Sequence, residues 1–213
     1  MGKTESFAVQ TSVGEAHVDL EQPTGAAVAL LLIGHGAGGG VDAADILALR
    51  DVALQRGIAV GRVAQPYRVQ GKKVPPAAPR LDAAWTEVAQ AVRQRPRMGL
   101  PLLLAGRSSG ARVACRTAGL LEAVAVVALA FPVHPPGKPE KSRLDELDSV
   151  KVPTLIVQGS SDAFGMPPAK GPKTQRRSLY VVAGADHSLR RATPEVQAAA
   201  GEFFDTVLAA QPS

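Results

Sequence analysis

The 213-residue sequence contains one cysteine, Cys115, and aromatic residues make up only 4% of it. A single cysteine excludes an internal disulfide, a thiolate zinc cluster and a Cys-x-x-Cys redox pair, and it fits a reducing cytoplasm. Scarce aromatic side chains leave little surface on which nucleic-acid bases could stack. The net charge of +5 comes from basic pairs scattered along the chain. We therefore expect a solvated basic surface and no nucleic-acid partner.

Long hydrophobic runs are also missing. The longest, at residues 123–133, is shorter than the roughly 18 to 20 residues that a membrane-spanning helix needs. The polar start "MGKTES" has no apolar segment like that of an export signal. These observations predict a cytoplasmic protein with no membrane partner. A composition of 46% hydrophobic residues at this length predicts a single domain, residues 1–213, with one sizeable core.

Short apolar segments alternate along the chain with segments of helical periodicity. The predicted strands are residues 6–11, 15–23, 26–34, 58–66, 101–106, 123–131, 153–159 and 178–184. The first two alternate polar and apolar residues, as an antiparallel edge does, whereas most later ones are continuously apolar, as in strands covered on both faces. Helices are predicted over 42–57, 81–92 and 193–207, and another helical pattern follows residue 110. This alternation predicts the α/β class, with a mostly parallel sheet flanked by helices.

Polar and small residues mark the ends of these helices. Asp42, with Asp45 three residues on, is predicted to cap the first helix, and Gly57 to close it. Thr193-Pro194 is predicted to supply the cap and the first residue of the last helix. Trp85 lies on the apolar face of the helix at 81–92, so we predict that it belongs to the core.

The stretch "LLIGHGAGGG" at residues 31–40 contains the G-x-G-x-x-G spacing of dinucleotide-binding folds. Such folds carry an acidic residue about 20 residues further on, to hold the ribose hydroxyls. The next predicted strand ends without an acidic residue. Arg62 on that strand could bind the 2′-phosphate of NADP, so NADP binding stays an open alternative. A P-loop is excluded because no Lys-Ser/Thr follows the glycines.

A second glycine motif, G-x-S-x-G, is formed by Gly106, Ser108 and Gly110 in "PLLLAGRSSGARVA". It lies directly between an apolar strand and a helical pattern, which is the context of a nucleophile elbow. A serine on so sharp a turn needs small residues two positions before and after it, because strand and helix approach closely there. The motif therefore predicts Ser108 as a nucleophile.

A serine hydroxyl needs a histidine to take its proton and a carboxylate to orient that histidine. Asp162 follows the strand "PTLIVQG" and His187 follows the strand "SLYVVAG", in the order serine, acid, histidine. The carboxyl ends of parallel strands meet at one edge of a sheet, so we predict that the three side chains converge. Asp186 and Ser109 are adjacent residues of the same types, and their positions argue against them as acid and nucleophile.

The glycines at 31–40 then gain a different role, because acyl transfer needs two N–H donors for an oxyanion. We predict that these donors are the backbone amides of Ser109 and Ala37. His35 is predicted to brace this loop through hydrogen bonds.

The segments "LLIGHGAGGG", "AGRSSGARVA", "FPVHPPGKPEK", "VPTLIVQGSSDAFG" and "GADHSL" resemble the α/β-hydrolase superfamily, and within it the dienelactone-hydrolase-like branch. They look like small bacterial relatives of the testis-expressed and nonspecific-lethal-complex subunit proteins of animals. The resemblance spans about residues 26–208. It implies an eight-stranded, mostly parallel sheet with helices on both faces and a triad of Ser108, Asp162 and His187. It implies no particular substrate, and Arg107 in the elbow receives no role.

About 20 residues separate Phe131 from Val152, which leaves no room for a large cap domain. The proline-rich segments 65–79 and 131–141 are predicted to be loops at the rim of the site. Arg68, Lys72 and Lys73 either steer anionic substrates or belong to a solvated loop.

The sequence thus predicts a serine hydrolase that cleaves a small-molecule ester or related acyl bond, with no cofactor and no metal. The alternative is a noncatalytic scaffold that keeps the fold, as complex-forming animal relatives do. The sequence indicates neither the natural substrate nor the oligomeric state.

Overall fold

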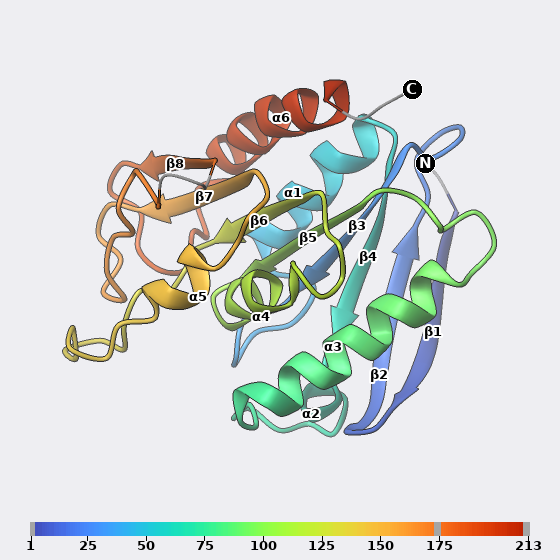
Figure 1. Cartoon of the computed structure of the whole chain (residues 1–213), viewed down its shortest axis with the longest axis horizontal. Helices are drawn as coiled ribbons and strands as arrows, with labels where there is room; N and C mark the ends of the chain where they lie inside the picture. The colour runs from blue at the N-terminus through green and yellow to red at the C-terminus, as the bar shows by residue number, and fades with distance from the viewer. Residues whose placement is uncertain (1–2, 173–175, 211–213) are drawn as a thin grey trace.

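A computed structural model describes residues 3–172 and 176–210 (Figure 1). Within these residues, eight strands form one sheet in the spatial order β1-β2-β4-β3-β5-β6-β7-β8. The strands are β1 (Thr4–Thr11), β2 (Gly14–Glu21), β3 (Ala29–Gly34), β4 (Ile58–Ala64), β5 (Leu102–Arg107), β6 (Ala125–Leu129), β7 (Thr154–Gly159) and β8 (Arg177–Val182). Strand β2 runs antiparallel to both β1 and β4, and every other neighbouring pair is parallel. The predicted α/β class and the mostly parallel sheet are confirmed.

The helices lie on both faces of this sheet. They are α1 (Ala44–Gln55), α2 (Pro66–Val69), α3 (Ala78–Arg93), α4 (Ser109–Thr117), α5 (Leu144–Asp148) and α6 (Thr193–Ala209). Helices α3 and α4 pack on one face, and α1 and α6 pack on the other (Figure 1). Strands β3, β6 and β7 are buried at every residue, as their continuous apolar sequences predict.

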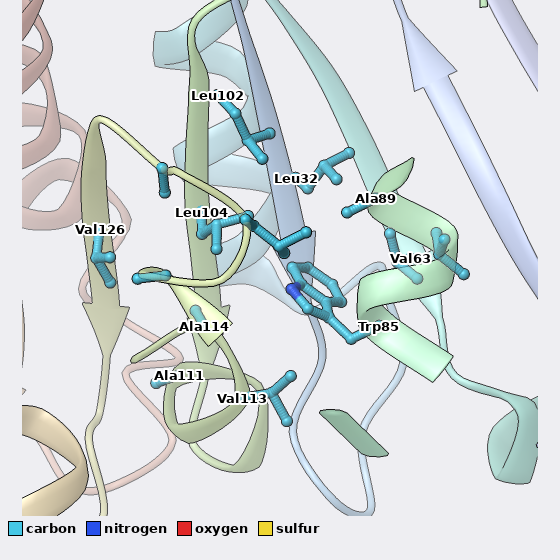
Figure 2. Packing of buried hydrophobic residues seen from close by; sticks show 14 of the residues in the cluster. Leu32, Val63, Trp85, Ala89, Leu102, Leu104, Ala111, Val113, Ala114 and Val126 are labelled. Carbon is cyan, nitrogen blue, oxygen red and sulfur yellow. The ribbon is translucent and has the colours of Figure 1, made fainter. Parts of the chain in front are cut away.

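One hydrophobic cluster fills each face of the sheet. Trp85 of α3 is 1% exposed and packs among residues of the sheet and of α4, including Leu32 and Leu104 (Figure 2). Its predicted place in the core is confirmed. Cys115 of α4 belongs to the same cluster, and burial raises the pKa of its thiol to about 12. On the opposite face, Phe204 of α6 is fully buried in the second cluster.

The predicted caps of two helices are wrong. Helix α1 has Ala43 as its N-cap, and the Asp42 side chain instead pairs with Arg62 of β4. A buried guanidinium needs counter-ions, and this long-range demand overrides the local capping preference. Helix α6 has Ala192 as its N-cap, so Thr193 lies inside its first turn. Gly57 ends the α1 segment with a φ of 74°, as predicted.

The first of the two proline-rich segments contains a short helix, whereas residues 131–141 form a loop as predicted. Helix α2 lies within residues 65–79, and α3 begins at Ala78, before the predicted end of that loop. Helix α5 is the only helix that the described residues contain between β6 and β7, and it spans five residues. No large cap covers this part of the fold. In the described ranges, we find no helix with the length and apolar character required to span a bilayer.

Candidate functional site

Ser108 occupies a sharp turn between β5 and α4. Its backbone has φ 51° and ψ −109°, in a region that residues other than glycine rarely adopt. A Cβ atom at Gly106 would lie 2.2 Å from the Gly110 carbonyl carbon, and one at Gly110 would lie 2.4 Å from the Gly34 carbonyl oxygen. Both positions therefore require glycine in this backbone, and the strain at Ser108 is held by tight packing on each side.

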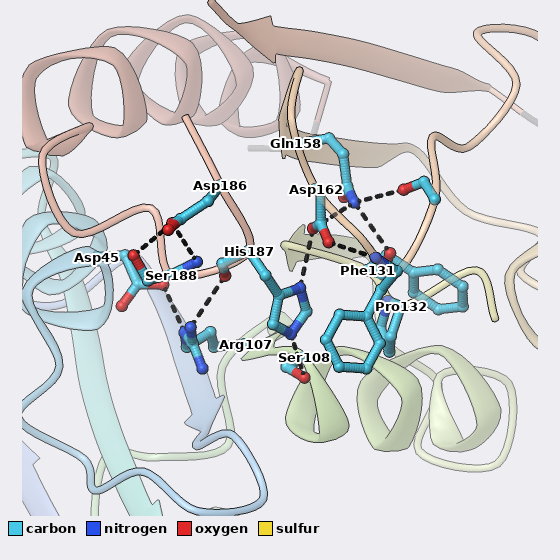
Figure 3. Close-up of polar contacts among 12 residues, drawn as sticks. Asp45, Arg107, Ser108, Phe131, Pro132, Gln158, Asp162, Asp186, His187 and Ser188 are labelled. Atoms are coloured by element: carbon cyan, nitrogen blue, oxygen red, sulfur yellow. Dashed lines mark hydrogen bonds and ion pairs between the residues drawn. The ribbon is translucent and has the colours of Figure 1, made fainter. Parts of the chain in front are cut away.

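The structure brings Ser108, His187 and Asp162 into one hydrogen-bonded chain (Figure 3). His187 Nε2 lies 2.9 Å from Ser108 Oγ, and His187 Nδ1 lies 2.8 Å from Asp162 Oδ2. The Asp162 side chain is fully buried, whereas that of His187 is 19% exposed. The three residues come from the ends of β5, β7 and β8, which are far apart in sequence. The arrangement can move a proton from a hydroxyl to an imidazole that a buried carboxylate holds.

Asp162 is fixed by groups other than His187. The backbone amide of Phe164 donates to its Oδ1 at 2.8 Å, and the Gln158 side-chain amide donates to its Oδ2 at 2.8 Å. Gln158 is fully buried at the end of β7. We did not single it out from the sequence, although a glutamine inside an otherwise apolar strand end was a visible signal. The Phe164 ring stacks on the His187 ring with centroids 4.0 Å apart, which fixes the imidazole further.

The neighbouring acid Asp186 does not face His187. Its side chain accepts hydrogen bonds from the Ser188 amide and hydroxyl, at 2.8 and 2.6 Å. These bonds lower the pKa of the Asp186 carboxyl. Asp186 therefore organises the turn after β8, and Asp162 is the acid placed at the imidazole.

The glycine-rich loop after β3 packs against the elbow. Tyr67 of α2 donates to the Ala37 carbonyl at 2.9 Å, which holds that residue from outside. Within the described residues, the amides of Ala37 and Ser109 donate to no other protein group. Free amides beside a strained serine are the donors that an oxyanion needs.

His35, at the start of this loop, is 3% exposed. The Gln65 amide donates to its Nε2 at 3.1 Å, so Nδ1 carries the proton and donates to the Gly36 carbonyl at 2.8 Å. Burial lowers the pKa of the ring, which favours this neutral form. His35 thus links the glycine-rich loop to the segment after β4, in the bracing position that the sequence predicts.

Two basic residues singled out from the sequence have protein partners. Arg62 pairs with Glu21 at 3.0 Å and also with Asp19 and Asp42, so its guanidinium is occupied by carboxylates. This removes the basis for a 2′-phosphate site there. Arg68 donates to the Lys72 carbonyl at 3.0 Å and so closes its own loop.

Arg107, for which no role was predicted, contacts both helix α1 and the loop that carries His187. Its guanidinium donates to the His187 carbonyl at 2.9 Å and to Asp45 of α1 at 3.2 Å (Figure 3). In the parts of the chain that the structure describes, no group of three or more His, Cys, Asp or Glu side chains is arranged to hold a metal ion.

Comparison with known proteins identifies the family of this chain. Residues 27–207 match the model of a family described as an alpha/beta hydrolase domain, and the chain belongs to this family. The match begins just before β3 and ends within α6, so it includes all the strands whose ends build the site.

Solved structures share the fold across nearly the whole chain. An α/β serine hydrolase without a lid from Xanthomonas campestris is 19% identical, with a TM-score of 0.78, over 99% of this chain and 97% of that one. Est1E from Butyrivibrio proteoclasticus, with ferulic acid bound, is 18% identical, with a TM-score of 0.78, over 95% and 99%. A dienelactone hydrolase from Anabaena variabilis is 20% identical, with a TM-score of 0.73, over 95% and 98%. At these identities the likeness establishes the fold.

Proposed function

We propose that the protein is a serine hydrolase that cleaves a small ester or a related acyl bond through an acyl-enzyme intermediate. The observation that carries the proposal is the continuous chain from Ser108 through His187 to the buried Asp162, with links of 2.9 and 2.8 Å. Membership of the α/β-hydrolase family supports the same reaction class. The proposal needs neither a cofactor nor a metal.

In the first half of the reaction, Ser108 Oγ attacks the acyl carbon while His187 Nε2 takes its proton. Asp162 accepts a hydrogen bond from Nδ1–H of His187, keeps the ring in the required tautomer and stabilises the imidazolium. The imidazolium then protonates the leaving alcohol as the bond to the acyl carbon breaks. In the second half, His187 takes a proton from water as the water attacks the acyl carbon. The imidazolium then returns a proton to Ser108 Oγ as the bond between Oγ and the acyl carbon breaks, which releases the acid.

The tetrahedral intermediates carry a negative oxygen, and we propose that it accepts hydrogen bonds from the amides of Ala37 and Ser109. Ser109 is the first residue of α4, so the helix dipole adds to the effect of its N–H. Removing one such donor typically costs about 10² to 10³ in turnover.

The surroundings of the elbow favour a small acyl group. The cavity that lies behind Ser109 and Gly110, against Trp85, has a volume of about 10 Å³, roughly the space of one water molecule. The segment between β6 and β7 carries only the five-residue α5, so no large cap encloses the substrate. We propose that the acyl chain occupies a shallow cleft between residues 65–79 and 131–149.

Labelling with a fluorophosphonate probe tests the nucleophile directly. The wild-type protein should be labelled at Ser108, and Ser108→Ala should lose both labelling and esterase activity, with a loss in turnover on the order of 10⁶-fold. His187→Ala should lose a similar factor. Ser178→Ala, at an exposed serine near the start of β8 and outside the proposed cleft, is a matched control that should behave as wild type. If folded wild-type protein is not labelled by the probe, the result would instead favour the interpretation as a noncatalytic scaffold.

A further inference from the structure

Arg107 is the last residue of β5 and immediately precedes Ser108. Its side chain does not extend into solvent, since only 18% of it is exposed. Nε donates to Asp45 Oδ2 at 3.2 Å, and Nη2 donates to the His187 carbonyl at 2.9 Å (Figure 3). One planar guanidinium thus joins the first turn of α1 to the loop that carries the imidazole.

Asp45 anchors this guanidinium from a buried position. The Asp45 side chain is 1% exposed, and its second oxygen accepts the Ile46 amide at 3.0 Å. Burial raises the pKa of the Asp45 carboxyl, and Arg107 opposes that rise. A buried carboxylate is costly without a cation, so the position of each charge depends on the other.

The same guanidinium also supports the glycine-rich loop. A Cβ atom at Gly36 would lie 2.8 Å from Arg107 Nη1 and 3.7 Å from its Cδ. The loop backbone at Gly36 therefore rests directly on the Arg107 side chain. Ala37, whose amide is the proposed oxyanion donor, is the next residue.

We propose that Arg107, held by Asp45, is a positioning residue that sets the distance between the His187 loop and the oxyanion loop. The inference rests on the serine hydrolase mechanism above, because it concerns how the loops that carry the base and the oxyanion donor are held. Arg107 acts through these two loops and not on the substrate. An error of about 1 Å in such positions costs about 10² in rate.

The test compares arginine variants by steady-state kinetics and by the rate of fluorophosphonate labelling. Arg107→Met should lower kcat about 10- to 100-fold with KM changed less than about threefold, because a displaced base and donor act on the chemical step. Labelling of Ser108 should slow by a similar factor. Asp45→Asn should give the same pattern, and the double variant should lose no more than the worse single variant, because the two residues act as one unit.

The variant Arg107→Lys distinguishes a loss of positioning from a folding defect. It keeps a cation beside Asp45, yet one ammonium cannot present the fork that reaches Asp45 and the His187 carbonyl together. This variant should fold, as judged by its melting temperature, and should still lose kcat within the same range. Arg116→Met is the matched control, because Arg116 is 17% exposed and pairs with Asp82 at 2.6 Å, away from both loops. It should lower the melting temperature but keep the wild-type kcat.

The outcomes separate this inference from the proposed function. Folded Arg107→Lys that is labelled at the wild-type rate overturns the inference while the hydrolase proposal stands. Equal losses of kcat in Arg107→Met and Arg116→Met overturn it too, because they indicate general destabilisation. Wild-type protein that is not labelled at Ser108 removes the hydrolase proposal, and the inference with it.

Discussion

Gly159, the last residue of β7, lies under the loop that carries His187. A Cβ atom there would lie 2.3 Å from the Ala185 carbonyl oxygen and 2.7 Å from the Asp186 carbonyl oxygen, whereas ordinary contact begins at 3.4 Å. Gly159→Ala must therefore move this loop by about 1 Å to restore ordinary contact, while Ser108, Asp162 and His187 remain chemically intact. Because a displacement of that size costs about 10² in rate, we expect kcat/KM to fall about 100-fold.

The assay is hydrolysis of p-nitrophenyl acetate, with thermal unfolding measured on the same samples. Overpacking typically costs about 1–3 kcal/mol, and each kcal/mol lowers Tm by about 2–4 °C for a chain of this size. Gly159→Ala should therefore remain folded at 25 °C. Gly119→Ala is the control, since a Cβ atom at Gly119 meets nothing within 4 Å. A folded Gly159→Ala variant with wild-type kcat/KM would refute the reasoning that this glycine positions the base.

Three further predictions follow from the site. Asp162→Asn should lower kcat by about 10³ to 10⁴, because an amide would hold His187 in the wrong tautomer. Asp186→Asn should lower kcat far less, and the reverse ranking would transfer the role of the acid to Asp186. Burial lowers the pKa of His35, so its stabilising contribution is full above the unfolded value of about 6.5 and is lost as pH falls below it. Urea unfolding at pH 8 and pH 5 should therefore show a smaller loss of stability in His35→Gln than in wild type, and equal losses would contradict the role of His35. In a series of p-nitrophenyl esters, kcat/KM should stop rising beyond short acyl chains, because each added methylene contributes about 0.8 kcal/mol only where a pocket buries it. A steady rise in kcat/KM to long chains would instead indicate an apolar tunnel.

Local patterns predicted the strands well, because continuous apolar runs and short turn segments are properties of neighbouring residues. The buried strands β3, β6 and β7 were readable in this way. The glycines at 106 and 110 were likewise predictable, since their demand for space arises within five residues of sequence.

Features that depend on contacts between distant segments were not predictable. The predicted Asp42 cap is wrong because the Asp42 carboxylate pairs with Arg62, twenty residues further on. No local sequence pattern indicates where the strand that carries Arg62 lies in the sheet. Arg107 was missed for the same reason, since its partners lie 62 and 80 residues away, in α1 and in the loop after β8. Gln158 contacts Asp162 only four residues further on, so its role was open to prediction from the sequence. The order of residues along the chain indicated candidates for a triad, but the distances between them come from the sheet.

Because Cys115 is buried, this chain is well suited to site-specific labelling through an introduced cysteine. Cys115 is the one cysteine in the sequence, and with a pKa of about 12 it stays protonated and shielded in the folded protein at neutral pH. A cysteine introduced at an exposed rim position would be the sole reactive thiol, so a fluorophore or spin label could be attached there without first removing a native residue. Conversely, the native thiol becomes accessible only when the core beneath α4 opens. The rate at which a maleimide modifies Cys115 therefore measures the rate of unfolding in solution.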